Sequence, residues 1–115
     1  MSDQESSIAE NAVIFVNRFT LHTSPEEFER VFAETARFLQ RQPGFLEYTL
    51  SRHADNPGGY LNIARWRDAR AFHTAVTHPD FAAHAAALRA VSTSDPGLYV
   101  PRRTATAQAA EQERP

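Results

Sequence analysis

The segment Ala12–Leu21 (AVIFVNRFTL) has the composition of a β-strand, yet neither of its faces suits water. Successive side chains of a strand point to opposite faces. One face carries Val13, Phe15, Asn17 and Phe19, and the other carries Ile14, Val16 and Arg18. The segment Tyr60–Trp66 repeats this pattern. A sheet that is apolar on both faces needs two covers, so we expect helices on one face and a second copy of the chain on the other. A monomer whose C-terminal tail folds over the sheet is the alternative.

The order of the predicted elements is β-α-β-β-α-β. Ser24 and Glu27 form a capping box ahead of an apolar helical stripe (Phe28, Val31, Phe32, Thr35 and Leu39), which ends at Gln42-Pro43-Gly44. Strands follow at Phe45–His53 and Tyr60–Trp66. A second helical region starts at Asp68, breaks near Pro79 and continues to about Val91. We expect Asp95-Pro96-Gly97 to turn the chain into a short last strand, Leu98–Pro101. This order predicts an α+β, ferredoxin-like fold with a four-stranded antiparallel sheet.

The composition narrows the functional classes. At 115 residues the chain holds one domain, which we place at 11–101, between a flexible arm (1–10) and a disordered tail (102–115). A net charge of −2 with interleaved signs argues against a nucleic-acid partner, and no apolar run is long enough to span a membrane. The polar N-terminus has no secretory pattern, so we expect a cytoplasmic protein. The absence of cysteine excludes thiolate chemistry and disulfides.

Two asparagines interrupt the apolar strands. Asn17 lies among phenylalanines, and Asn62 shares a face with Trp66, about 13 Å away at a rise of about 3.3 Å per residue. An amide buried without partners costs about 1–3 kcal/mol. Each asparagine therefore either bonds to nearby backbone, as a purely structural residue, or faces a cavity that binds something polar. The span from Asn62 to Trp66 suits a flat molecule of a few fused rings.

These residues, in this order, resemble the antibiotic biosynthesis monooxygenase (ABM) family. The resemblance rests on the stretches FVNRF (15–19), QPGF (42–45), NIARW (62–66) and HPDF (78–81). The resemblance implies a dimeric α/β barrel built from ferredoxin-like protomers. The chain is most similar to the quinone-forming anthrone and naphthacenone oxygenases of aromatic polyketide pathways. Because Asn17, Asn62 and Trp66 match positions used by some of those oxygenases, the resemblance implies that they are catalytic. Other members add a Tyr in the second helical region, where this chain has Phe72.

The resemblance implies oxidation of an anthrone-like substrate to a quinone by O2, without a metal or tightly bound cofactor. Loss of a proton gives an electron-rich enolate that reduces O2 directly. Amide groups suit stabilisation of the enolate oxygen, and aromatic side chains suit a flat substrate. Asn is too weak a base to take the proton, so hydroxide or a histidine is expected to do so. Expected substrate-binding residues are Phe15, Phe28, Phe32, Phe72, Phe81, His73 and His84.

The same residues bear on other cofactors and activities. No His and carboxylate spacing indicates a metal site, and no glycine-rich motif indicates a dinucleotide. A reduced flavin from a partner reductase stays open, for an oxygenase or for a ring-cleaving enzyme. Haem-degrading relatives share the first-strand Asn but need a Trp where this chain has Thr74 and Ala75. A dimer that binds an aromatic ligand without catalysis is the further alternative, and it predicts no O2 consumption.

Overall fold

The computed structural model describes residues 11–108, so the predicted N-terminal arm and the last seven residues lie outside the described part. The described residues form four strands and three helices, in the expected order with the second helical region divided in two. The elements are β1 (Val13–Leu21), α2 (Pro25–Gln40), β2 (Phe45–Arg52), β3 (Gly59–Trp66), α3 (Ala69–Val76), α4 (Phe81–Val91) and β4 (Ser92–Tyr99).

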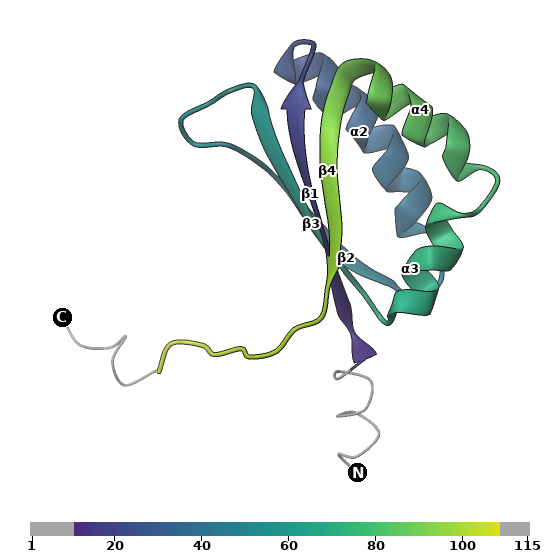
Figure 1. Ribbon diagram of the computed structural model, residues 1–115, viewed down its shortest axis with the longest axis vertical. Coiled ribbons are helices and arrows are strands. Elements are labelled where there is room, and N and C mark those ends of the chain that lie inside the picture. Colours follow the sequence, from purple (N-terminus) through teal and green to yellow (C-terminus); the bar gives the residue numbers. More distant parts are fainter. Residues whose placement is uncertain (1–10, 109–115) are drawn as a thin grey trace.

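The strands form one antiparallel sheet in the order β2-β3-β1-β4. All three helices lie on one face of this sheet, as Figure 1 shows, and the other face is left uncovered. The predicted α+β, ferredoxin-like architecture of the chain is therefore confirmed. Two aromatic clusters fill the space between the layers, one around Trp66 and Phe72 and the other around Phe28 and Tyr60.

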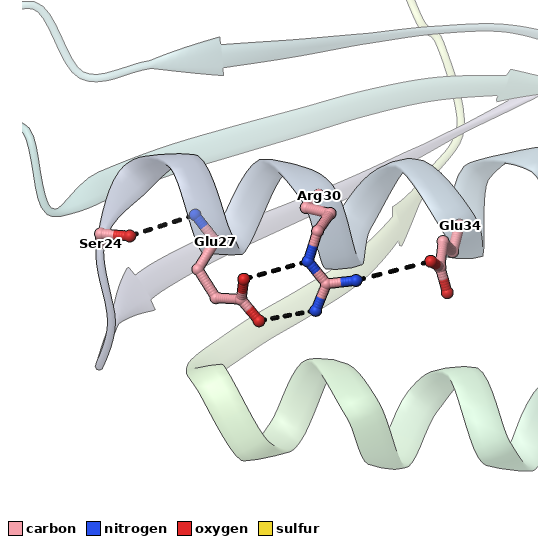
Figure 2. Close-up of polar contacts among 4 residues, drawn as sticks. All are labelled: Ser24, Glu27, Arg30 and Glu34. Atoms are coloured by element: carbon pink, nitrogen blue, oxygen red, sulfur yellow. Dashed lines mark hydrogen bonds and ion pairs between the residues drawn. The ribbon is translucent and has the colours of Figure 1, made fainter.

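Helix α2 begins where the capping box predicts. The Ser24 hydroxyl accepts a hydrogen bond from the backbone N–H of Glu27 at 3.1 Å, and Pro25 occupies the first turn. Arg30 then pairs with Glu27 and with Glu34 along the exposed side of the helix (Figure 2). The pairing with Arg30 lowers the pKa of the Glu27 carboxyl. These local bonds fix the start of α2, which covers one face of the sheet.

The second helical region is interrupted at the predicted place. Asp68 caps α3 by accepting a hydrogen bond from the N–H of Ala71 at 2.8 Å. The helix ends at Val76, Pro79 lies in the turn, and α4 starts at Phe81. The break lets α4 leave the line of α3 and pack beside α2 (Figure 1).

The last strand begins six residues earlier than predicted, at Ser92 and not at Leu98, so the predicted start was wrong. Strand β4 runs from Ser92 to Tyr99, so Asp95-Pro96-Gly97 lies inside the strand and forms no turn. Pro96 cannot donate to a strand ladder, but β4 is at the edge of the sheet, where one side needs no partner. The edge position therefore tolerates a tripeptide that usually marks a turn.

The uncovered face of the sheet is apolar at its centre. Ile63 is 42% exposed there, beside Ile14, Val16 and Leu61. Residues 101–108 are exposed, contain no helix or strand, and run away from the sheet rather than over it (Figure 1). Within residues 11–108, no helix combines the length and hydropathy needed to cross a membrane.

Candidate active site

A cavity lies between the sheet and the helices, and it has two connected parts. The outer chamber, about 420 Å³, is bordered by α4 and β4 and is the more open. The inner chamber, about 80 Å³, lies deeper, between α2 and the strands β2 and β3. The chambers meet at residues that line both, namely Phe15, Asn17, Phe19, Phe72, Val76, Phe81 and Leu88. Together they fall in the size range of sites for small organic ligands.

Asn17 and Asn62 lie side by side on the sheet, in the wall of the inner chamber. They are direct partners in the antiparallel register of β1 and β3, and both line the inner chamber. Partners of this kind have Cβ atoms about 4.5–5.5 Å apart. The sheet register thus brings the two amides together, although 44 residues separate them in the chain.

The amide of Asn17 is held by the edge strand. Its Oδ1 accepts a hydrogen bond from the backbone N–H of Asp95 at 3.1 Å. This contact is the structural role that a strand asparagine was expected to have as one alternative. It also orients the side chain, because the Nδ2 group is then the end left to donate to a ligand.

Asn62 has no such anchor. The residue is 6% exposed, and its Oδ1 is buried without a hydrogen-bond partner among the described residues. The Thr35 hydroxyl, on α2, is in the same condition at 3% exposure, and it lines the inner chamber as well. Unpartnered buried oxygens cost free energy, so a water molecule or a polar group of a ligand would be stabilised at this end of the cavity.

Trp66 forms one wall of the inner chamber. It is 1% exposed and makes edge-on contacts with Phe45 and Phe72, at ring-centroid distances of 5.3 and 5.8 Å. Such T-shaped contacts favour a fixed ring orientation. The three residues for which catalytic roles were expected, Asn17, Asn62 and Trp66, therefore share one chamber.

The predicted aromatic lining is present except for one residue. Phe15, Phe72 and Phe81 line both chambers, and Phe32 lines the inner one. Phe28 does not line the cavity, because it is fully buried against Phe19, Phe32 and Tyr60. Its position in the apolar stripe of α2 indicated burial correctly but could not distinguish core from cavity.

The two histidines expected at the site are not brought to it. His73 is exposed on the outer side of α3. His84 packs against Phe38, at 5.5 Å between ring centroids, in the contact between α4 and α2. Neither residue lines a chamber, so the structure does not bring them to the candidate site.

The cavity is almost free of charge. Among the described residues, Arg89, at the outer chamber, is the one charged side chain that lines it. No group of three or more His, Asp or Glu residues that could hold a metal ion occurs within 11–108. The chemistry of the lining is therefore that of neutral amides, hydroxyls and aromatic rings.

Several lining residues were not predicted as site residues. The sequence contained a signal for Thr35, because it is the one polar residue in the apolar stripe of α2. It contained none for Tyr48 and Leu88, since their spacing matches that of ordinary core residues. The outer rim, Ser92 and Ser94, was missed because β4 was predicted to begin after it.

The sequence matches the family model described as antibiotic biosynthesis monooxygenase over residues 13–87. The chain belongs to this family. It is 55% identical to deoxynogalonate monooxygenase of Streptomyces nogalater over 92 residues, which are 80% of this chain and 78% of that protein. The predicted family resemblance is thereby confirmed.

Solved structures of similar chains agree with the fold. SnoaB, a cofactor-independent oxygenase from Streptomyces nogalater, superposes with a TM-score of 0.80 at 54% identity, covering 82% of this chain and 96% of SnoaB. A conserved protein from Methanosarcina mazei gives a TM-score of 0.74 at 15% identity, covering 84% of this chain and 99% of that chain. At this lower identity the likeness concerns the fold alone.

Proposed function

We propose that the protein is a monooxygenase that oxidises a reduced, anthrone-like polycyclic polyketide to a quinone with O2, without a metal or a tightly bound cofactor. The observation that carries the proposal is the uncharged aromatic cavity with Asn17, Asn62 and Trp66 around its inner end. The 55% identity to deoxynogalonate monooxygenase and the TM-score of 0.80 with SnoaB support the same reaction class.

The cavity favours the enolate form of the substrate. Removing a proton from the methylene group places negative charge on the neighbouring carbonyl oxygen. The Nδ2 group of Asn17, oriented by the bond from Asp95 to its Oδ1, can donate to that oxygen. A donor held in place before the reaction stabilises developing charge more than a mobile one.

The proton goes to water or hydroxide rather than to a side chain. No carboxylate and no histidine lines either chamber among the described residues. The outer chamber is open enough for solvent to reach the substrate edge. Stabilisation of the enolate therefore has to lower the pKa of the substrate, because the protein supplies no base beside it.

The oxygen chemistry balances without a further reductant. The enolate transfers an electron to O2, and the resulting radical pair combines to a peroxide at the former methylene carbon. Loss of water leaves the carbonyl, so that the methylene group and O2 become a quinone carbonyl and water. Aromatic walls such as Trp66 and Phe72 keep bulk water away from these intermediates.

One assay with two arms distinguishes this reaction from its alternatives. Chelator-treated protein is mixed with anthrone in air, and O2 uptake and quinone formation are followed with and without reduced flavin. We expect acceleration over spontaneous oxidation in both arms. Acceleration in the flavin arm alone would favour the flavin-assisted alternative. Binding without acceleration in either arm, across several ring systems, would favour a non-catalytic binder and would refute the proposal.

We also propose that the protein works as a homodimer in the cytoplasm. The uncovered apolar face around Ile63 supports the dimer, because the described part of the tail does not cover it. In such a dimer the helix-covered cavity stays within each protomer.

A further inference from the structure

The inner chamber holds a polar pair that the reaction above does not use in full. Three polar residues of the described chain are buried: Thr35, Asn62 and Ser92. The Ser92 hydroxyl donates to the carbonyl oxygen of Leu88 at 2.8 Å and is thus satisfied. Thr35 and Asn62 are not satisfied, and both line the inner chamber.

Thr35 lacks even the bond that a helical threonine usually makes. A threonine hydroxyl within a helix commonly donates to the carbonyl four residues earlier, here that of Val31. Here the Thr35 hydroxyl has no hydrogen-bond partner in the part of the chain that the structure describes. Its place in the apolar stripe of α2 turns it toward the sheet, with Phe32 and Ala36 as neighbours in the lining.

The two unpaired oxygens define what would satisfy them. Asn62 Oδ1 is an acceptor, so the ligand must bring a hydrogen-bond donor. The Thr35 hydroxyl can donate, so the ligand can also bring an acceptor. One phenolic hydroxyl does both, because it donates its proton to Asn62 while its oxygen accepts from Thr35. A hydrocarbon edge or a methyl group does neither.

We propose that Thr35 is a substrate-binding residue, which acts with Asn62 to hold one hydroxyl group of the aromatic substrate at the closed end of the cavity. The inference rests on the proposed function, because it takes the ligand to be a polycyclic phenol. It adds a specificity: the ring that enters first carries a free hydroxyl, and the ring near Asn17 carries the reacting carbon.

The test uses two probes that differ in one group, 2-hydroxyanthraquinone and 2-methylanthraquinone, at a pH where the phenol is protonated. Trp66 is the only tryptophan in the chain and lines the inner chamber, so quenching of its fluorescence reports binding directly. The variants are Thr35→Val, which keeps the shape and removes the hydroxyl, and Thr35→Ser, which keeps the hydroxyl. Thr74→Val is the matched control, an exposed helical threonine outside the cavity.

We expect the native protein to bind the hydroxyl probe more tightly than the methyl probe. Thr35→Val should weaken binding of the hydroxyl probe by about 2- to 13-fold, the range for one neutral hydrogen bond, and leave the methyl probe unchanged. Thr35→Ser should restore the preference, and Thr74→Val should not alter it. The melting temperature of ligand-free Thr35→Val should stay level or rise, because an unpaired buried hydroxyl is removed.

Three results would overturn the assignment. Equal weakening of both probes by Thr35→Val would show a packing role, and a lower melting temperature would show a structural partner for the hydroxyl. A native preference that survives Thr35→Val would place the phenol elsewhere. Failure of the native protein to bind either probe would instead refute the aromatic cavity, and with it the proposed function.

Discussion

Asn17 and Asn62 are direct cross-strand partners, yet their amides are in opposite situations. The Oδ1 of Asn17 accepts a hydrogen bond from the N–H of Asp95, whereas the Oδ1 of Asn62 is buried with no partner within residues 11–108. One amide is therefore oriented by the protein as a donor toward the cavity. The other presents an acceptor that only a ligand or a water molecule can satisfy.

This difference predicts distinct effects of two substitutions at Asn17. Asn17→Asp keeps an oxygen for the Asp95 N–H but replaces the Nδ2 donor with negative charge. We expect a normal melting temperature and a loss of about 10²-fold or more in kcat, as for removal of an oxyanion donor. Asn17→Ala should lose activity and also some stability, because the Asp95 N–H loses its acceptor.

Thermal unfolding and anthrone oxidation, measured on both Asn17 variants, check this prediction. Full activity in Asn17→Asp would show that the Nδ2 group is not used. Full activity in both variants would remove Asn17 from the site.

The absence of a side-chain base from the described lining predicts a simple pH dependence. The rate of quinone formation should rise with pH as the hydroxide concentration rises, without an inflection near the usual histidine pKa of about 6.5. His73→Gln should leave this profile unchanged, because His73 is exposed on α3 outside the cavity. A plateau with a histidine-like pKa that disappears in His73→Gln would contradict this mechanism.

The cap of α3 makes part of the stability dependent on pH. The hydrogen bond from the N–H of Ala71 lowers the pKa of the Asp68 carboxyl from its ordinary value of 3.8, with a smaller contribution from Arg67. A lowered pKa in the folded state means that the stabilisation is complete above 3.8 and is lost as the pH falls through the folded value. Asp68→Ala should thus destabilise the protein at neutral pH, by an amount that shrinks in acid.

Urea unfolding of native protein and Asp68→Ala, at neutral pH and below the ordinary Asp pKa, measures that difference. A difference that stays constant with pH would show that the charge of Asp68 does not contribute to the cap.

The uncovered sheet face predicts a dimer that one charge can break. Ile63→Glu places a carboxylate at the centre of the exposed apolar patch, and burying it against a second copy would be costly. We expect sedimentation to show a dimer for the native protein and a monomer for Ile63→Glu. Thr74→Glu, which adds the same charge on the helical side, should stay dimeric. A native monomer would contradict the proposal.

The sequence predicted the fold and grouped three candidate site residues for a physical reason. Strand alternation assigns Asn17, Asn62 and Trp66 to faces, and the β-α-β-β-α-β order pairs β1 with β3, which brings these residues together. His73 and His84 lie outside the chambers, which the sequence did not predict, because helical periodicity near a break does not determine which side faces a cavity. The predicted start of β4 was wrong because a proline such as Pro96 is typical of a turn, and the sequence does not show that this strand lies at the edge of the sheet.

The role of Thr35 depends on a further level of information. The sequence places it in a buried stripe, but whether its hydroxyl finds a partner depends on the neighbouring backbone and the shape of the space beside it. The local sequence pattern determines neither the position of that backbone nor the shape of that space. The same holds for Phe28, which shares the stripe and packs in the core.

In the proposed reaction, the cavity directs oxygen from O2 into the substrate without a cofactor. The most direct measurement is a reaction of chelator-treated, flavin-free protein with anthrone under oxygen-18 gas, followed by mass spectrometry of the quinone. We predict enzyme-dependent quinone in which the new carbonyl oxygen carries the label, with one O2 consumed per quinone formed. A labelled quinone incubated in the same buffer controls for exchange of oxygen with water. Unlabelled oxygen at the new carbonyl beyond that exchange would contradict the proposed reaction. A rate of quinone formation no faster than without protein would contradict it as well.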